Sequence, residues 1–206
     1  MENITNYYGF ILSVILLSIT PGADTVFILT KSIAGGYKQG LASVAGIVCG
    51  LFVHTSLAAF GLSVILMTSA LLFNIVKIAG AAYLIYLGIM ALKSKSKINF
   101  ENKGEIVPFF TTFRQGFFTN ILNPKVALFF LALLPQFVKS NAESAVPFLI
   151  LGLTFIFIGS LWSLFLVWAS ARMSQALRQS KFSFYLNKAA GIIFIALGLN
   201  ILRLRN

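Results

Sequence analysis

The sequence predicts an all-α protein that crosses a membrane several times. Of its 206 residues, 58% are hydrophobic and only 10% are charged, and the mean hydropathy is +0.91. A typical soluble domain has about 25% charged residues. We expect a polytopic membrane protein with six transmembrane helices, arranged as two inverted three-helix repeats. Helices 1 and 4 are predicted to be broken at motifs that contain proline.

The predicted spans are each close to the roughly 20 residues that cross a bilayer core. They cover 7–29, 41–67, 71–92, 117–138, 146–170 and 188–204. The longest gap, 93–116, is rich in lysine, and we expect it to be a basic cytoplasmic loop. It separates a first repeat, 1–92, from a second, 117–206, within one integral membrane domain that comprises 1–206.

The distribution of positive charge predicts the orientation. If both ends of the chain lie outside, the cytoplasmic loops hold 11 lysines and arginines and the outer loops hold 3. Cytoplasmic loops of membrane proteins carry such an excess. The net charge of +11 is therefore attributed to orientation in a bilayer and not to nucleic-acid binding. The single cysteine, Cys49, excludes an intramolecular disulfide and a CxxC redox pair.

Two pairs of similar segments suggest that the halves are repeats. Ile-Thr-Pro21 in the first span resembles Leu-Asn123-Pro124 in the fourth, and 79–88 (AGAAYLIYLG) resembles 190–198 (AGIIFIALG). A duplicated unit with three spans enters the membrane from opposite sides, as in many secondary transporters. The alternative is that small and aromatic residues are common wherever membrane helices pack.

The first break places an acidic residue inside an apolar span. Pro21 deprives the carbonyl of Leu17 of its helical bond, and Gly22 allows the backbone to bend. A half-helix is expected to begin near Ala23, with Asp24 in its first turn. Free N–H groups there suit a carboxylate, and Asp24 suits an ammonium. The alternative is that Asp24 only caps the half-helix or lies at the inner membrane interface.

The second break places a basic residue in the fourth span. Pro124 releases the carbonyl of Asn120, and Asn123 adds an amide that needs partners when buried. Lys125 lies too deep to reach water fully, so pairing with Asp24 would ease the burial of both. We predict a shared binding site, with a permanent ion pair that only locks the halves together as the alternative.

Two features of the second span have both functional and structural interpretations. His54, the only histidine, is suited to exchange protons near neutral pH, so a relay with Asp24 is one hypothesis. A lone histidine on an apolar face is more often a packing residue. Gly46 and Gly50 form a GxxxG step that permits close helix contact, within one chain or between two.

Together these motifs identify a resemblance to a known family. Pro21-Gly22-Ala23-Asp24, the glycine-rich turn 35–40 (GGYKQG), the basic central loop and Asn123-Pro124-Lys125 resemble the lysine-exporter (LysE/RhtB-type) family of bacterial amino-acid efflux proteins. The family more often has a second proline at the position of Ala23. The resemblance implies a bacterial cytoplasmic (inner) membrane protein that exports amino acids or close derivatives, driven by the proton gradient.

A single acidic residue in the spans favours a neutral substrate. A lysine or arginine substrate carries a second cation, which is costly to desolvate without a second carboxylate. We therefore expect a homoserine, threonine or leucine type of substrate, with protons and the lipid bilayer as further partners. No cofactor and no nucleic acid are expected, and a homo-oligomer is left open.

Two other classes of function fit the sequence less well. A small-ion or metal exporter would need ligands, and one His, one Asp and one Cys in the spans make a poor set, so no metal site is predicted. An intramembrane enzyme would need a nucleophile and a base, but Thr55 and Ser56 beside His54 match no recognisable catalytic motif. No catalytic residue is therefore predicted.

Overall fold

The structure is a computed structural model that describes residues 3–62, 108–139 and 144–172, with isolated residues between 71–93 and 188–199. The described residues form helices joined by short turns, with no strand beyond one isolated bridge. The all-α prediction is confirmed for this part of the chain. Apart from those isolated residues, the predicted spans 71–92 and 188–204 lie outside the described residues, as does most of the loop 93–116.

The first predicted span is broken where the sequence places Pro21. Helix α1 covers Tyr7–Ile19 and begins at Asn6, whose side chain accepts a hydrogen bond from the Gly9 N–H. It ends at Thr20, and α2 (Ala23–Leu57) begins two residues after the proline. The break follows from Pro21, because a proline in the helix interior removes one hydrogen bond and clashes with the preceding turn.

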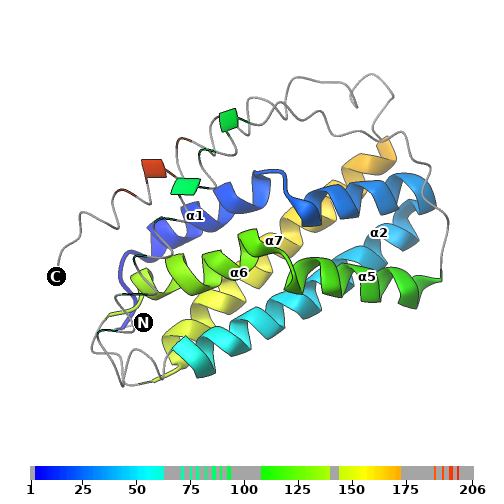
Figure 1. Cartoon of the computed structure of the whole chain (residues 1–206). Coiled ribbons are helices and arrows are strands. Elements are labelled where there is room, and N and C mark those ends of the chain that lie inside the picture. Colours follow the sequence, from blue (N-terminus) through cyan, green and yellow to red (C-terminus); the bar gives the residue numbers. More distant parts are fainter. Residues whose placement is uncertain are drawn as a thin grey trace.

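Helix α2 is a hairpin of two arms. Gly36 adopts φ 69° and ψ −164°, a backbone conformation that only glycine takes readily. The chain reverses there, so that the first arm, 23–35, lies beside the second arm, 37–57 (Figure 1). A side chain at Gly40 would collide with the Ser32 hydroxyl of the first arm. The helical arm therefore extends to residue 35, beyond residue 29, where the predicted span ends. A single π-helical turn, η1 (Ala58–Leu62), continues the second arm.

The fourth predicted span is also broken. Helix α5 covers Phe109–Ile121, and after the Asn123-Pro124 break come α6 (Pro124–Leu128), η2 (Phe129–Leu133) and η3 (Leu134–Phe137). The two parts are bent by 45°. The helix begins at Phe109 and not at 117, within the segment predicted to be a loop. Thr112, which is fully buried, hydrogen-bonds Gln39 of α2, so packing holds this polar stretch in a helix.

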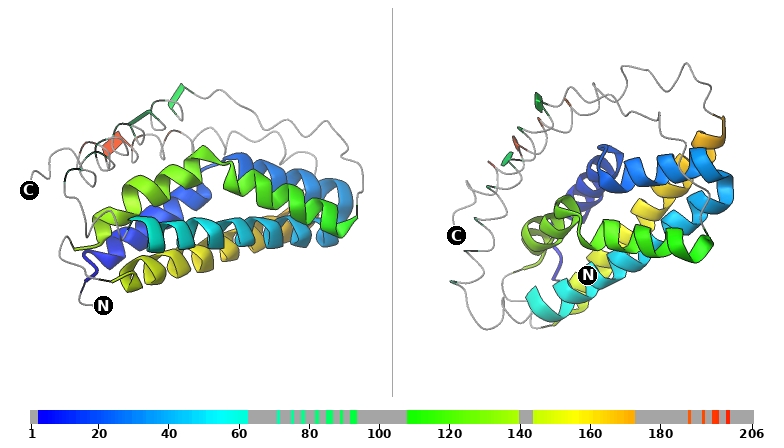
Figure 2. Two further views of the ribbon diagram at one scale, coloured as in Figure 1. Left: turned by 60° about the horizontal axis from the view of Figure 1, so that its bottom comes forward. Right: turned by 45° about the vertical axis from the view of Figure 1, so that its right-hand side comes forward.

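The remaining described helix, α7 (Val146–Arg172), runs the length of the bundle. By length and composition, two described stretches qualify as membrane spans: Ala23–Gly61, which contains both arms of the α2 hairpin, and Val146–Ser170. The bent pair Phe109–Ile121 and Pro124–Phe137 adds a third. In Figures 1 and 2 the segment formed by α1 and the first arm of α2 runs in the opposite direction to the segment formed by α5 and α6.

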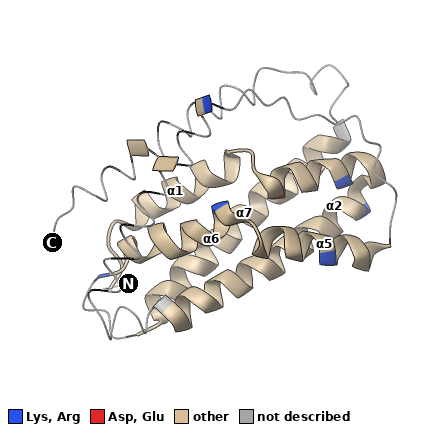
Figure 3. Ribbon diagram, in the orientation of Figure 1, with Lys and Arg blue, Asp and Glu red and all other residues tan. Residues whose placement is uncertain are grey.

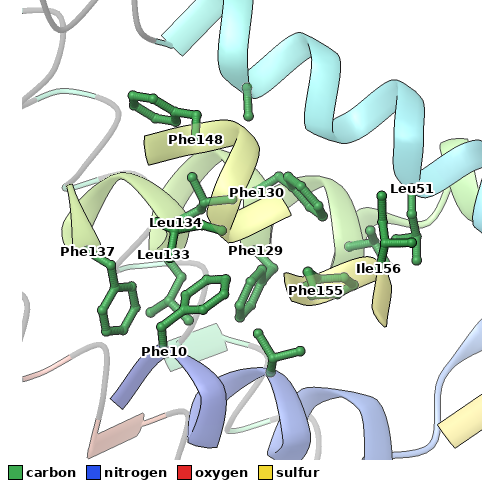
Figure 4. Packing of buried hydrophobic residues seen from close by; sticks show 14 of the residues in the cluster. Phe10, Leu51, Phe129, Phe130, Leu133, Leu134, Phe137, Phe148, Phe155 and Ile156 are labelled. Carbon is green, nitrogen blue, oxygen red and sulfur yellow. The ribbon is translucent and has the colours of Figure 1, made fainter. Parts of the chain in front are cut away.

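Two apolar clusters occupy the two ends of the bundle. The larger lies at the end where the chain begins, which we call the N-terminal end, and packs Phe10 of α1 against Phe129 and Phe137 (Figure 4). An isolated bridge between Ile4 and Val138 covers the same end. The smaller cluster lies nearer Gly36, at what we call the Gly36 end, and contains Ile28, Leu29, Val44, Ile47, Leu166 and Val167. The two breaks lie between the clusters.

The glycines of the second arm bring α2 against α5. A Cβ atom at Gly46 would overlap the Phe113 carbonyl oxygen, and one at Gly50 would lie 2.6 Å from the Asn120 Oδ1. From the opposite side, a Cβ at Gly116 would lie 2.8 Å from the Ser43 carbonyl oxygen. The GxxxG step therefore packs two helices of one chain against each other. This contact sets the position of Asn120 along the second arm of α2.

Candidate functional site

The two breaks meet, and Lys125 joins them. Its Nζ donates hydrogen bonds to the carbonyls of Leu17 and Thr20, each at 2.7 Å. The Leu17 carbonyl is the group that Pro21 deprives of its helical partner. An ammonium from the second break thus satisfies the orphaned end of α1 and interacts favourably with the negative end of that helix. Gly22 lies so close that a Cβ atom there would be 3.3 Å from the Lys125 side chain.

Asp24 makes the reciprocal contact. It lies in the first turn of α2, where its Oδ2 accepts a 2.8 Å hydrogen bond from the Asn120 Nδ2 of α5. The residue at the cap of α2, Gly22, has no side chain to bond the helix end. The carboxylate therefore reaches across to the other broken span. The interpretation in which Asp24 only caps its own half-helix does not describe this geometry.

Asp24 and Lys125 line the same cavity without a direct ion pair. In the described part of the chain, the hydrogen bonds of Lys125 Nζ go to backbone carbonyls and that of Asp24 goes to Asn120. The alternative of a permanent ion pair that locks the two halves is therefore not what the structure contains. Because the Asp24 carboxylate and the Lys125 ammonium line one cavity but do not bond each other, both charges remain available to a bound ligand.

The residues of the second break hold it in place. The Asn123 side chain accepts a 3.1 Å hydrogen bond from the Lys125 N–H and so caps α6, in which Pro124 is the first residue. Proline suits this position because its missing N–H would have no helical partner there. Asn123 itself is buried. The predicted residues of the second break therefore position Lys125 beneath α1.

His54 contacts the site through Asn120. Its Nε2 lies 3.2 Å from the Asn120 carbonyl oxygen, which is the group that Pro124 releases from its helical bond. The imidazole ring stacks on the Phe130 ring, with the ring centroids 5.6 Å apart. In the described part of the chain, no hydrogen bond joins His54 directly to Asp24. Asn120 therefore stands between His54 and Asp24, with its carbonyl toward one and its side-chain amide toward the other.

A small cavity of about 50 Å³ lies where the breaks meet. An engineered protein cavity of about 150 Å³ holds benzene, so the cavity must widen before an amino acid can enter. Its lining includes residues of α1, α2, α6 and α7: Leu17, Ser18, Gly22, Asp24, Thr25, Ile28, Ile47, Leu51, Asn123, Lys125, Val126, Phe155, Gly159, Trp162, Ser163 and Leu166. The contribution of α7 was not predicted from the sequence.

Buried polar atoms at the site lack hydrogen-bond partners among the described residues. They include Asp24 Oδ1, Asn120 Oδ1 and Trp162 Nε1. Leaving such a group unpaired costs about 1–3 kcal/mol, more for a charged one. Asp24 and Trp162 both line the cavity. The arrangement therefore offers a ligand one acceptor with negative charge and one neutral donor, beside the Lys125 ammonium.

Replacing Lys125 with Met is expected to destabilise the protein, because the carbonyls of Leu17 and Thr20 would lose their donor in apolar surroundings. We expect a loss of about 2–4 kcal/mol, or a fall in melting temperature of about 10 °C. Thermal unfolding in detergent measures this. Lys139→Met is the matched control, since the Lys139 side chain is exposed. Equal melting temperatures for the two variants would contradict a structural role for the Lys125 ammonium.

Comparison with known proteins gives a consistent result. The family described as LysE type translocator matches residues 15–205. The chain is 33% identical over 193 residues to "Uncharacterized membrane protein YrhP" of Bacillus subtilis (strain 168), covering 89% of this chain and 92% of the relative. It is also 33% identical over 192 residues to the "Homoserine/homoserine lactone efflux protein" of Salmonella typhimurium and to that of Salmonella typhi, covering 93% of both chains each time. No solved structure matches the chain.

Proposed function

The chain belongs to the LysE type translocator family, and on that premise we propose that it exports an amino acid or a close derivative from the cytoplasm. Relatives of the same length carry the name homoserine/homoserine lactone efflux protein. The single observation that carries the proposal is the meeting of the breaks, which brings Asp24 and Lys125 to one cavity. A zwitterion has the two opposite charges that such a site would recognise.

The substrate is neutral overall, of the homoserine, threonine or leucine type. Asp24 is the only acidic residue in the lining of the cavity, as far as the chain is described. It can compensate one ammonium, and a second cation in the side chain of the substrate would have no carboxylate to pair with. The site residues predicted from the sequence, Pro21, Gly22, Asn120, Asn123 and Pro124, hold Asp24 and Lys125 in position.

The Gly36 end faces the cytoplasm in this proposal, with both ends of the chain outside. Lysines and arginines on α2 and α5 gather toward the Gly36 end (Figure 3), as expected for a cytoplasmic face. The two broken spans run in opposite directions, which supports an inverted repeat of two three-helix units. The apolar clusters at the two ends then act as the outer and inner gates in alternating access.

Export is proposed to be coupled to protons, with Asp24 as the group that exchanges a proton for the substrate. His54 takes part through Asn120, which bonds both residues. When His54 gains or loses charge, its contact with the Asn120 carbonyl changes, and this alters how firmly the Asn120 amide holds the carboxylate. In this proposal, His54 therefore affects proton exchange at Asp24 without a direct contact between the two side chains.

Replacing His54 with Gln tests the coupling, since the amide of Gln can still bond the Asn120 carbonyl but does not titrate. We expect exchange of substrate for substrate to continue within about threefold of the unmodified rate, while net export driven by a pH gradient falls by about tenfold or more. Both rates are measured in proteoliposomes, and the exchange rate is the control for folding. An unchanged response to the pH gradient would leave His54 as a packing residue.

The proposed export is tested in cells that do and do not produce the protein. The cells are fed dipeptides that release homoserine, threonine, leucine or lysine, and the intracellular amino acids are measured over time. We expect the protein to reduce the accumulation of at least one neutral amino acid and to leave that of lysine unchanged. A preference for lysine would overturn the neutral substrate, and no change in any amino acid or in homoserine lactone would overturn the function.

A further inference from the structure

Trp162 of α7 contributes a polar group to the cavity, although it belongs to neither of the two breaks. Its indole Nε1 is buried and has no hydrogen-bond partner among the described residues. A buried indole N–H usually finds an acceptor. Trp162 lines the cavity that contains Asp24 and Lys125. Its ring is held from outside by Phe165, with the ring centroids 5.4 Å apart.

One face of α7 closes the cavity. Phe155, Gly159, Trp162 and Leu166 recur at helical spacing in its lining. Gly159 leaves room there, because a Cβ atom at that position would meet nothing closer than Leu51, at 3.8 Å. Apart from the indole N–H and the Ser163 hydroxyl, the part of the lining that α7 contributes is therefore apolar. The charged groups of the lining, Asp24 and Lys125, come from the two breaks.

The donors and acceptors of the cavity are complementary to one class of ligand. Asp24 Oδ1 has no bond among the described residues, and so it is available to an ammonium. Two of the three protons of Lys125 Nζ are committed to backbone carbonyls. The indole N–H is a neutral donor, which requires an acceptor oxygen but no negative charge. A ligand with an amino group and a carbonyl oxygen satisfies the two atoms of these cavity-lining residues that lack partners, Asp24 Oδ1 and Trp162 Nε1.

We propose that Trp162 Nε1 binds the carbonyl or carboxylate oxygen of the substrate while Asp24 binds its ammonium. The inference rests on the proposed function and assigns the chemistry by which the site selects its substrate. A free amino acid and its lactone or ester share the ammonium and the carbonyl oxygen, but only the free acid carries a carboxylate charge. One site therefore accepts both, and it discriminates against amines that lack the carbonyl.

The chain contains only two tryptophans, which makes the site directly observable. Trp162 becomes the single tryptophan in Trp168→Phe, which changes a residue that is half-exposed and does not line the cavity. We expect homoserine and homoserine lactone to change the fluorescence of this variant in a saturable manner. We expect 3-aminopropan-1-ol, which is homoserine without its carboxyl group, to require about tenfold higher concentration.

Trp162→Phe removes the N–H and keeps an aromatic ring. Binding to this variant, measured by calorimetry, is expected to weaken about tenfold for homoserine and its lactone but to remain unchanged for 3-aminopropan-1-ol. Trp162→His restores a ring N–H and is expected to recover part of the discrimination. Since the loss depends on the ligand having a carbonyl, a general defect of folding would not reproduce it.

The outcomes separate this inference from the proposed function. If Trp162→Phe binds and exports homoserine and its lactone as the unmodified protein does, the role of Trp162 is wrong and amino-acid export stands. If homoserine is exported but causes no saturable change in the fluorescence of Trp162, the inference is likewise overturned, and this measurement requires no change in the cavity. If the unmodified protein exports no amino acid or lactone, the proposed function fails first.

Discussion

Asp24→Asn is expected to reduce substrate binding and export by at least about hundredfold. The variant keeps the size of the side chain and an oxygen that can accept the bond from Asn120. It loses the negative charge that would compensate the substrate ammonium. Leaving a buried charge without its partner costs about 3–5 kcal/mol, which corresponds to more than a hundredfold in affinity. Exchange of labelled homoserine in proteoliposomes measures the loss.

Melting temperature separates this loss of function from a loss of fold. Removal of a buried carboxylate does not disturb the bonds of Lys125 to α1, so the variant is expected to unfold within a few degrees of the unmodified protein. A variant that keeps its melting temperature but loses exchange has lost the binding charge. Full exchange by Asp24→Asn would exclude Asp24 as the group that binds the ammonium or carries the proton.

Gly46→Ala is expected to have a large effect on stability. The added Cβ would overlap the Phe113 carbonyl oxygen and lie 2.8 Å from the Phe117 nitrogen, and backbone atoms cannot move aside as a flexible side chain can. Overpacking costs about 1–3 kcal/mol, and more where helices must separate. We expect a fall in melting temperature of about 6–12 °C, measured by unfolding in detergent.

Gly61→Ala is the matched control for this effect. It makes the same substitution near the end of the same hairpin, where a Cβ atom would meet nothing within 4 Å. Its melting temperature is expected to stay within about 2 °C of the unmodified value. If both variants unfold alike, the loss comes from helix propensity or lipid contact and not from the approach of α5 to the second arm of α2.

The breaks were predictable because their causes are local. Pro21 and Pro124 each remove a backbone donor wherever they stand, and glycine or asparagine beside them marks the turn. The structure contains both breaks, and α2 begins at the predicted residue. The sequence also indicated that Pro21 would free the Leu17 carbonyl. The sequence did not indicate that Lys125 would donate its hydrogen bonds to this carbonyl and not to the Asp24 carboxylate. Which acceptor Lys125 reaches depends on how the first and fourth spans pack against each other.

Other features were missed because their signals are not local. The start of α5 was placed at 117, since Thr112 and its polar neighbours resemble a loop until Gln39 is brought against them. The cavity wall from α7 was missed for the opposite reason. Apolar residues surround that helix on all sides, so no periodic pattern marks the face on which Trp162 lies.

The bonds that Lys125 makes to α1 also constrain how the protein is made. Lys125 follows Leu17 by 108 residues and Thr20 by 105. At about 5–20 residues per second, the ribosome reaches this lysine on the order of ten seconds after the first span has emerged. Throughout that interval the carbonyls of the first break lack their eventual donor. The first span must therefore enter the bilayer with this end hydrated or held by the insertion machinery, and its final position is set only when the fourth span arrives.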